Sequence, residues 1–266
     1  MLSALARAAQ VLDEPYWLER AQRTAAFLRR ELVDSTGGRL WRSRCAGRAG
    51  TPGFAEDYAC LIAGLIDLYE AGGGVEWLQW AGELQDQMDL LFRDTAEGGY
   101  FGSAAGDSTI VVRLKEGYDG AEPAAGSVAA LNLLRLSALL GREDWRRLAE
   151  STISSFRIQL EAAPQALPQL LVAVDFGREP VQQLVFAGRP EDPALRALVR
   201  EAHRGLARPR VLLWADGGSG QEWLARQRPE LAGKRPLGGR AALYLCRGAT
   251  CLPPITEVTQ VAPLLD

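Results

Sequence analysis

The chain has 266 residues, of which 47% are hydrophobic and 24% are charged. This composition is typical of a soluble globular protein and excludes disorder along the whole chain. Thirty Lys and Arg residues against 33 Asp and Glu residues leave a formal net charge of −3, and no predicted helix face collects basic side chains, so a nucleic-acid partner is not expected.

Residues 1–12 (MLSALARAAQVL) start with an apolar stretch that Arg7 interrupts. Their amphipathic spacing continues past Arg7 and predicts a helix of the mature protein rather than a signal peptide. No apolar run in the chain reaches the roughly 20 residues that a bilayer span needs. The sequence therefore predicts a cytoplasmic protein with no membrane partner.

An internal repeat organises the chain up to about residue 156. Residues 16–43 align without a gap to residues 76–103, and the shared apolar positions have the spacing of an amphipathic helix. The coinciding pairs are Trp17/Trp77, Leu18/Leu78, Ala21/Ala81, Leu28/Met88, Leu32/Phe92, Asp34/Asp94, Gly38/Gly98, Trp41/Phe101 and Ser43/Ser103. A third copy of this stripe begins at Trp145 and includes Ala149, Ile153 and Phe156.

A second, more apolar helix precedes each copy, at Leu2–Leu12, Tyr58–Ala71 and Val128–Leu140. Apolar residues on nearly all sides indicate that these inner helices are buried, whereas the outer helices keep one face in water. Such hairpins cannot bury their apolar faces alone, so they stack into a solenoid or a closed α/α toroid. Residues 1–180 are predicted to form an incomplete α/α toroid of about three helical hairpins.

The pattern changes after Pro180 to short apolar runs separated by helical stretches. Strands are predicted at Gln183–Ala187, Arg210–Trp214 and Ala242–Cys246, with helices near 193–203 and 221–231 and a last one from about Thr256. This alternation predicts a small parallel α/β unit with right-handed crossovers over residues 181–266. The expected fold class is mainly α, with the incomplete toroid followed by this unit.

Four cysteines are too few for the dense disulfide framework of a small secreted domain, so all four are expected to be reduced. Cys246 and Cys251 have no further Cys or His nearby to complete a zinc site. Cys45 and Cys60 lie far from them in sequence. The cysteines are interpreted as small buried hydrophobic residues, with no metal and no cofactor expected.

Several segments resemble the carboxyl-terminal region of the spermatogenesis-associated protein 20 family and its bacterial thioredoxin-domain-containing relatives. They are PGFAEDYACLIAGLIDLYEA (52–71), LKEGYDGAEPAAGSVAALNLLRL (114–136), LPQLLVAVDF (167–176) and ALYLCRGATCLPPIT (242–256). The resemblance implies an α/α toroid similar to those of N-acylglucosamine 2-epimerases and six-hairpin glycosidases. In that family a thioredoxin-like domain precedes the toroid, so the resemblance implies a carbohydrate ligand and a missing amino-terminal half with that domain as partners. An incomplete ring also leaves two hairpin faces exposed, which favours a second copy of the chain as a partner.

Toroids of this kind bind sugars near the start of their inner helices, where paired carboxylates serve as general acid and base. The loops that lead into the second and third inner helices contain the candidate residues. The catalytic candidates are Asp119, Glu116, Asp57 and Glu56, and the substrate-binding candidates are Tyr118, Tyr58, Phe54 and Lys115.

A structural interpretation competes with this one, because acids at a helix start also cap the helix and favour its dipole. Asp119 and Gly120 fit a tight turn equally well. The family motif also has Ser and Asn where this chain has Ala124 and Gly126, so two polar side chains are missing. A sugar-binding or glycoside-processing toroid and a non-catalytic scaffold or interaction fragment therefore remain alternatives.

Epimerases of this architecture move protons with two histidines, and this chain has one. His203 lies at the end of a predicted helix, where a cation that complements the helix dipole is the expected role. Epimerase activity by that mechanism is not expected.

Overall fold

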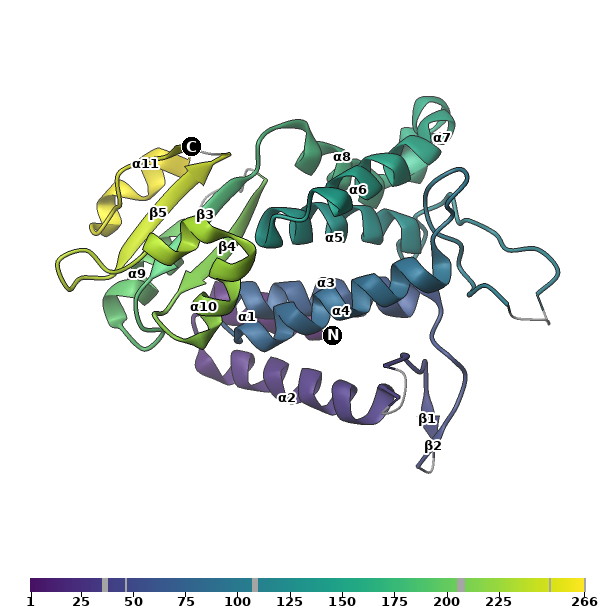
Figure 1. Cartoon of the computed structure of the whole chain (residues 1–266), viewed down its shortest axis with the longest axis horizontal. Coiled ribbons are helices and arrows are strands. Elements are labelled where there is room, and N and C mark those ends of the chain that lie inside the picture. Colours follow the sequence, from purple (N-terminus) through teal and green to yellow (C-terminus); the bar gives the residue numbers. More distant parts are fainter. Residues whose placement is uncertain (35–37, 46, 107–109, 205–208, 249, 266) are drawn as a thin grey trace.

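The structure is a computed structural model that describes residues 1–34, 38–45, 47–106, 110–204, 209–248 and 250–265. Three helical hairpins form its amino-terminal part (Figure 1). They pair an inner with an outer helix: α1 (Leu2–Leu12) with α2 (Pro15–Leu32), α3 (Ala55–Glu70) with α4 (Val75–Phe92), and α5 (Ala125–Leu140) with α6 (Glu143–Ser155). Since α3 packs against both α1 and α5, the inner helices form one continuous layer.

A further inner helix extends this layer. After the short α7 (Arg157–Ala162) and η1 (Pro164–Ala166), helix α8 (Pro168–Arg178) packs against α5. The buried residues of α8 are Leu170, Ala173 and Phe176. The repeat did not predict α8, because this helix is short and lacks the repeated outer partner. The described arrangement confirms the incomplete α/α toroid followed by a small α/β unit, with one more inner helix than expected.

The loops after α2 and α4 have the same backbone bonds, as the repeat predicts. The N–H of Trp41 donates to the carbonyl of Leu32 at 2.8 Å, and that of Phe101 donates to Phe92 at 2.9 Å. Gly98 has a φ of 77°, a left-handed conformation that glycine adopts without steric cost. Between α2 and α3, β1 (Arg44–Cys45) and β2 (Arg48–Ala49) form a small antiparallel hairpin.

The α/β unit has a four-stranded sheet in the order β4-β3-β5-β6. Its strands are β3 (Gln182–Ala187), β4 (Arg210–Ala215), β5 (Ala242–Arg247) and β6 (Thr250–Cys251). Its helices are α9 (Pro193–Ala202), α10 (Ser219–Gln227), η2 (Pro229–Gly233), η3 (Val258–Gln260) and α11 (Ala262–Leu265).

The expectation of an all-parallel sheet is wrong for β5. Strands β3 and β4 are parallel, but β5 is antiparallel to β3, with Ala242 opposite Ala187. Helix α10 leads the chain away from the carboxyl end of β4, and the segment after η2 leads it back to that end. Strand β5 therefore begins beside the carboxyl ends of β3 and β4 and runs in the opposite direction.

The sheet buries both faces, each in a different core. Val185, Val211 and Leu213 belong to the core of the helical hairpins. On the other face, Leu184, Phe186, Leu212, Leu243 and Leu245 form a second core with side chains of α9 and α11. The division into regions 1–180 and 181–266 remains a prediction, because one core crosses that boundary.

The expectation of four reduced, buried cysteines is also wrong. Cys246 and Cys251 form a disulfide, and Cys45 and Cys60 are free and exposed. The pairing follows from register, because Cys246 and Cys251 lie directly opposite each other on β5 and β6. Among the described helices, none combines the length and apolar character that crossing a bilayer would require.

Candidate functional site

The inner helices α3 and α5 begin at the end of the molecule that lies away from the sheet (Figure 1). Glu56 and Asp57 lie in the first turn of α3. The carboxylate of Asp57 accepts a hydrogen bond from the backbone N–H of Phe54 at 2.8 Å, which caps the helix start. Asp57 therefore has the structural role that its position also predicted.

Arg42 approaches this helix start from the loop after α2. Its guanidinium pairs with the carboxylate of Glu56 and lies 3.3 Å from that of Asp57. It also lies over the ring of Phe54, 5.3 Å from the centroid. The hydrogen bond to Glu56 and the charges of Asp57 and Glu56 raise the pKa of Arg42.

The charge of Glu122, in the loop before α5, acts on two side chains at this helix start, Arg42 and Cys60. Desolvation by neighbouring side chains, followed by the charges of Glu122, Glu56 and Asp57, raises the pKa of the exposed Cys60 thiol. The charge of Glu122 also raises the pKa of Arg42. The amino-terminal rim, which we define as Arg42, Phe54, Glu56, Asp57 and Glu122, thus combines one cation, one ring and three carboxylates.

Tyr58 lies in the core rather than at a stacking surface. Its side chain is 1% exposed, and its hydroxyl oxygen accepts a hydrogen bond from the N–H of Leu40 at 2.8 Å. The ring makes an edge contact with Phe92, with 5.4 Å between centroids. Tyr58 therefore fixes the loop after α2 to the helices and has no exposed face for a sugar.

The predicted residues before α5 have separate environments. The Lys115 ammonium pairs with Asp94 at 2.6 Å and donates to the carbonyl of Gly98 at 2.7 Å. The pKa of Asp94 is lowered to about 2, and the hydrogen bond from Lys115 is the largest cause of this shift. Glu116 and Tyr118 are exposed. Lys115 thus stabilises the loop after α4 and is not free to bind a substrate.

Asp119 is buried and fully used in hydrogen bonds to backbone groups. Its Oδ1 accepts from the N–H of Ala124 at 2.8 Å. Its Oδ2 accepts from the N–H groups of Gln169 at 2.9 Å and Leu170 at 3.3 Å. The carboxylate therefore joins the start of α5 to the first turn of α8, where a negative charge favours the helix dipole.

The rim therefore includes three of the eight predicted residues, Phe54, Glu56 and Asp57, together with Arg42 and Glu122. Arg42 was missed because an arginine in a loop has no spacing that predicts its partners. The repeat contained one usable signal: Arg42 follows Trp41, an aromatic position that recurs at Phe101 just before the chain leads to the next inner helix.

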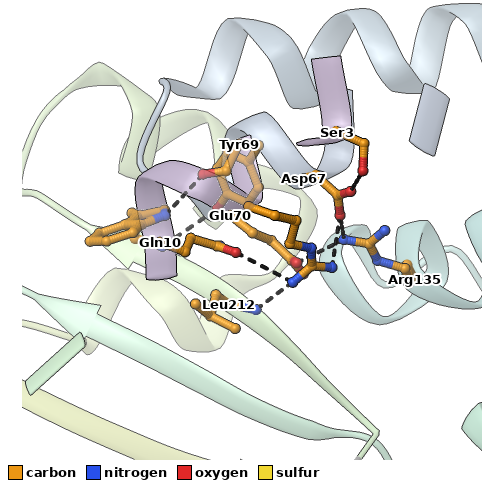
Figure 2. A network of polar contacts seen from close by, with 9 residues as sticks. Ser3, Gln10, Asp67, Tyr69, Glu70, Arg135 and Leu212 are labelled. Atoms are coloured by element: carbon orange, nitrogen blue, oxygen red, sulfur yellow. Dashed lines mark hydrogen bonds and ion pairs between the residues drawn. The ribbon is translucent and has the colours of Figure 1, made fainter. Parts of the chain in front are cut away.

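A second polar cluster lies at the opposite ends of the same helices. Figure 2 shows Arg135 of α5 facing two carboxylates of α3. Its guanidinium lies 2.7 Å from Asp67 and 2.7 Å from Glu70, and all three side chains are at most 8% exposed. Burial lowers the pKa of Arg135, but the carboxylates of Glu70 and Asp67 outweigh burial and raise it overall.

This cluster connects the helices to the sheet. The carboxylate of Glu70 accepts from the backbone N–H of Leu212 in β4 at 3.4 Å. The indole N–H of Trp214 donates to the carbonyl of Tyr69 at 3.0 Å. These hydrogen bonds hold the carboxyl-terminal end of α3 against β4. The cluster therefore has a structural role, which is to join the helices to the sheet.

His203 borders a cavity of about 310 Å³ beside this cluster, together with Arg7 and Arg210. Burial, followed by the charges of Arg210 and Arg7, lowers the pKa of His203 to about 4. Its Nε2 atom is buried and has no hydrogen-bond partner among the described residues. The expected cation at the end of α9 is therefore wrong: His203 is neutral near pH 7, because two arginines and burial oppose its protonation.

No family model matches the chain. The whole chain aligns over 274 positions with spermatogenesis-associated protein 20 of Rattus norvegicus at 38% identity and with that of Homo sapiens at 37%. It spans about a third (35%) of the length of each. A cellobiose 2-epimerase from Spirochaeta thermophila DSM 6192 has a similar fold, with a TM-score of 0.49 and 22% identity over 59% of this chain and 41% of that one. Over its whole length, this chain is thus similar to part of spermatogenesis-associated protein 20, as its motifs predicted.

Proposed function

We propose that this chain binds a carbohydrate at the amino-terminal rim and does not itself process a glycosidic bond. The observation that supports binding is the grouping of Arg42, Phe54 and Glu56 at the start of α3. A guanidinium and a carboxylate offer donors and acceptors to sugar hydroxyls, and an aromatic ring offers an apolar surface to the sugar face.

The exposure of these groups also favours binding. The side chains of Arg42 and Glu56 are 43% and 38% exposed, so a ligand can reach both without unfolding the helix start. Asp57 is only 23% exposed and is engaged in the cap. Glu122 adds a carboxylate from the loop before α5, so the rim has acceptors on two segments of the chain.

Turnover through Asp57 and Asp119 is excluded in this proposal because both carboxylates are already engaged in hydrogen bonds. General acid–base work on a glycoside needs two carboxyl groups that can reach the substrate and exchange protons. Asp119 accepts three backbone hydrogen bonds, and Asp57 caps α3. Neither carboxylate is available for a substrate while those bonds hold.

The test is saturation-transfer NMR followed by titration calorimetry with glucose, N-acetylglucosamine and cellobiose. Glu56→Gln and Arg42→Met are expected to weaken binding about tenfold, the effect of losing one charge-assisted hydrogen bond. Glu19→Gln and Arg23→Met are matched controls, because that exposed pair lies on the outer helix α2 with 2.6 Å between its charges. Absence of binding by the parent at millimolar sugar, or binding that both rim variants retain, would contradict the proposal.

The second candidate function is a non-catalytic scaffold within a thioredoxin-domain-containing protein. The specific observation in its favour is that Asp57, Lys115 and Asp119 all stabilise helix starts or loops. Under this function, no sugar binds and Asp119→Asn changes only stability. Co-purification of the chain with a separately expressed thioredoxin-like domain of the same gene would support it.

A further inference from the structure

We propose that Cys246, Cys251 and Lys234 form a site of thiol–disulfide exchange that reacts with a dithiol. The two cysteines are bonded across neighbouring strands at the β6 edge of the sheet. Cys251 is exposed, whereas Cys246 is 4% exposed. One sulfur is therefore accessible to an attacking thiolate and the other is held inside, an arrangement suited to a directional exchange.

Lys234 places a cation beside both sulfurs. Its Nζ lies 3.2 Å from the Sγ of Cys251 and 3.8 Å from the Sγ of Cys246. The ammonium also lies 4.5 Å from the centroid of the Tyr244 ring. Burial lowers the pKa of Lys234, and the charge of Glu230 opposes this shift in part. A neighbouring cation stabilises a thiolate, which is the nucleophile and the better leaving group in exchange.

The reaction balances with a dithiol as the only co-reactant. A thiolate of the dithiol attacks the Sγ of Cys251, forms a mixed disulfide and releases Cys246 as a thiolate beside Lys234. The second thiol of the dithiol loses its proton to solvent and attacks the mixed disulfide, which releases Cys251 as a thiolate. The dithiol is oxidised to a disulfide by two electrons, and Cys246 and Cys251 are reduced.

Opening the disulfide leaves the adjacent strand contacts in place. Leu243 and Ile255 exchange two backbone hydrogen bonds, at 2.8 and 2.9 Å, and the N–H of Leu252 donates to Leu245 at 2.9 Å. The disulfide closes a loop with a sequence separation of only 5, and short loops gain the least from a cross-link in the chain-entropy view. The fold therefore tolerates both redox states, as an exchange site requires.

The first test measures reduction of the folded chain by dithiothreitol at pH 7, with thiols counted by mass after alkylation and the fold followed by circular dichroism. We expect complete reduction without loss of helical signal. Lys234→Met is expected to slow reduction about tenfold, because the released thiolate loses its counter-charge. Arg235→Met is the matched control, since it removes an exposed positive charge one residue away and is expected to change the rate less than about twofold.

The second test follows single thiols by the pH dependence of alkylation with iodoacetamide. In Cys246→Ser, Cys251 is expected to react with an apparent pKa below the ordinary thiol value, and adding Lys234→Met is expected to return it toward about 8.5. A disulfide that opens only when the chain unfolds would overturn the proposal, as would equal reduction rates in the parent and Lys234→Met or cysteines that stay reduced in glutathione disulfide.

Discussion

The Oδ2 atom of Asp119 accepts a hydrogen bond from the backbone N–H of Gln169 at 2.9 Å. This bond joins the loop before α5 to the first turn of α8, 50 residues along the chain, and fixes the start of α8 against the start of α5. The same carboxylate accepts from Ala124 through its other oxygen. A single side chain thus sets the relative position of two inner helices.

Asp119→Asn is expected to destabilise the chain by about 1–2 kcal/mol, because an amide has one acceptor oxygen and no charge to favour the α8 dipole. Thermal and urea unfolding of the variant measure this loss. Asp192→Asn is the matched control, since Asp192 caps the surface helix α9 with one bond to Ala194 at 2.9 Å. An unchanged melting temperature together with lost sugar binding would instead assign Asp119 to a sugar site.

Arg135→Met is expected to cost about 3–5 kcal/mol, because it leaves the buried carboxylates of Asp67 and Glu70 without their shared cation. Urea unfolding, monitored by the tryptophans, measures the change. Arg146→Met removes an exposed arginine that pairs with Glu150 at 3.1 Å and is expected to cost less than about 1 kcal/mol. Similar losses in the two variants would contradict the central role of Arg135.

His203 predicts a loss of stability in mild acid. Its pKa is lowered to about 4 in the folded chain and is about 6.5 in an unfolded one. The unfolded chain therefore binds the extra proton, and stability falls as the pH decreases from about 6.5 to about 4, by up to about 3 kcal/mol. Urea midpoints across this range test the effect. His203→Gln should flatten this part of the profile, and an unchanged slope would show that other groups cause it.

The outer face beside α8 predicts self-association, which remains a proposal. A groove of about 440 Å³ there includes Leu134, Ile153, Leu160 and Val174, and Ile158, close to Leu160 in sequence, is 73% exposed. Apolar patches of this kind favour association. Sedimentation velocity over a concentration series is expected to show dimers that Val174→Asp weakens. A monomer at all concentrations, with no binding of a hydrophobic dye, would contradict this.

The helical hairpins were predictable because all three copies contain the same apolar stripe and the first two also contain the same loop. Trp17/Trp77 and Asp34/Asp94 locate equivalent positions whose local backbone bonds repeat in the structure. Local chemistry also indicated the α3 cap, since Asp57 bonds to a backbone group only three residues away.

The remaining features depend on contacts between distant segments or on the pairing register of a short strand. The role of Asp119 needs α8, which the repeat does not contain, and the disulfide needs the register of a two-residue strand. The low pKa of His203 depends on burial and then on the charges of Arg210 from β4 and Arg7 from α1. None of these contacts has a sequence spacing, so a local pattern could not reveal them.

The bond between Glu70 and the backbone of Leu212 has a consequence for how the chain unfolds. One face of the sheet shares its apolar core with the hairpins. Separating the two regions would therefore expose that core and leave the buried charged groups of α3 without their contacts to the sheet. Cleavage of the chain near Pro180 would leave two fragments, and each would lack the side chains that the other contributes to the shared core. The helices and the sheet should therefore melt in one cooperative step, with far-ultraviolet dichroism and Trp214 fluorescence changing together.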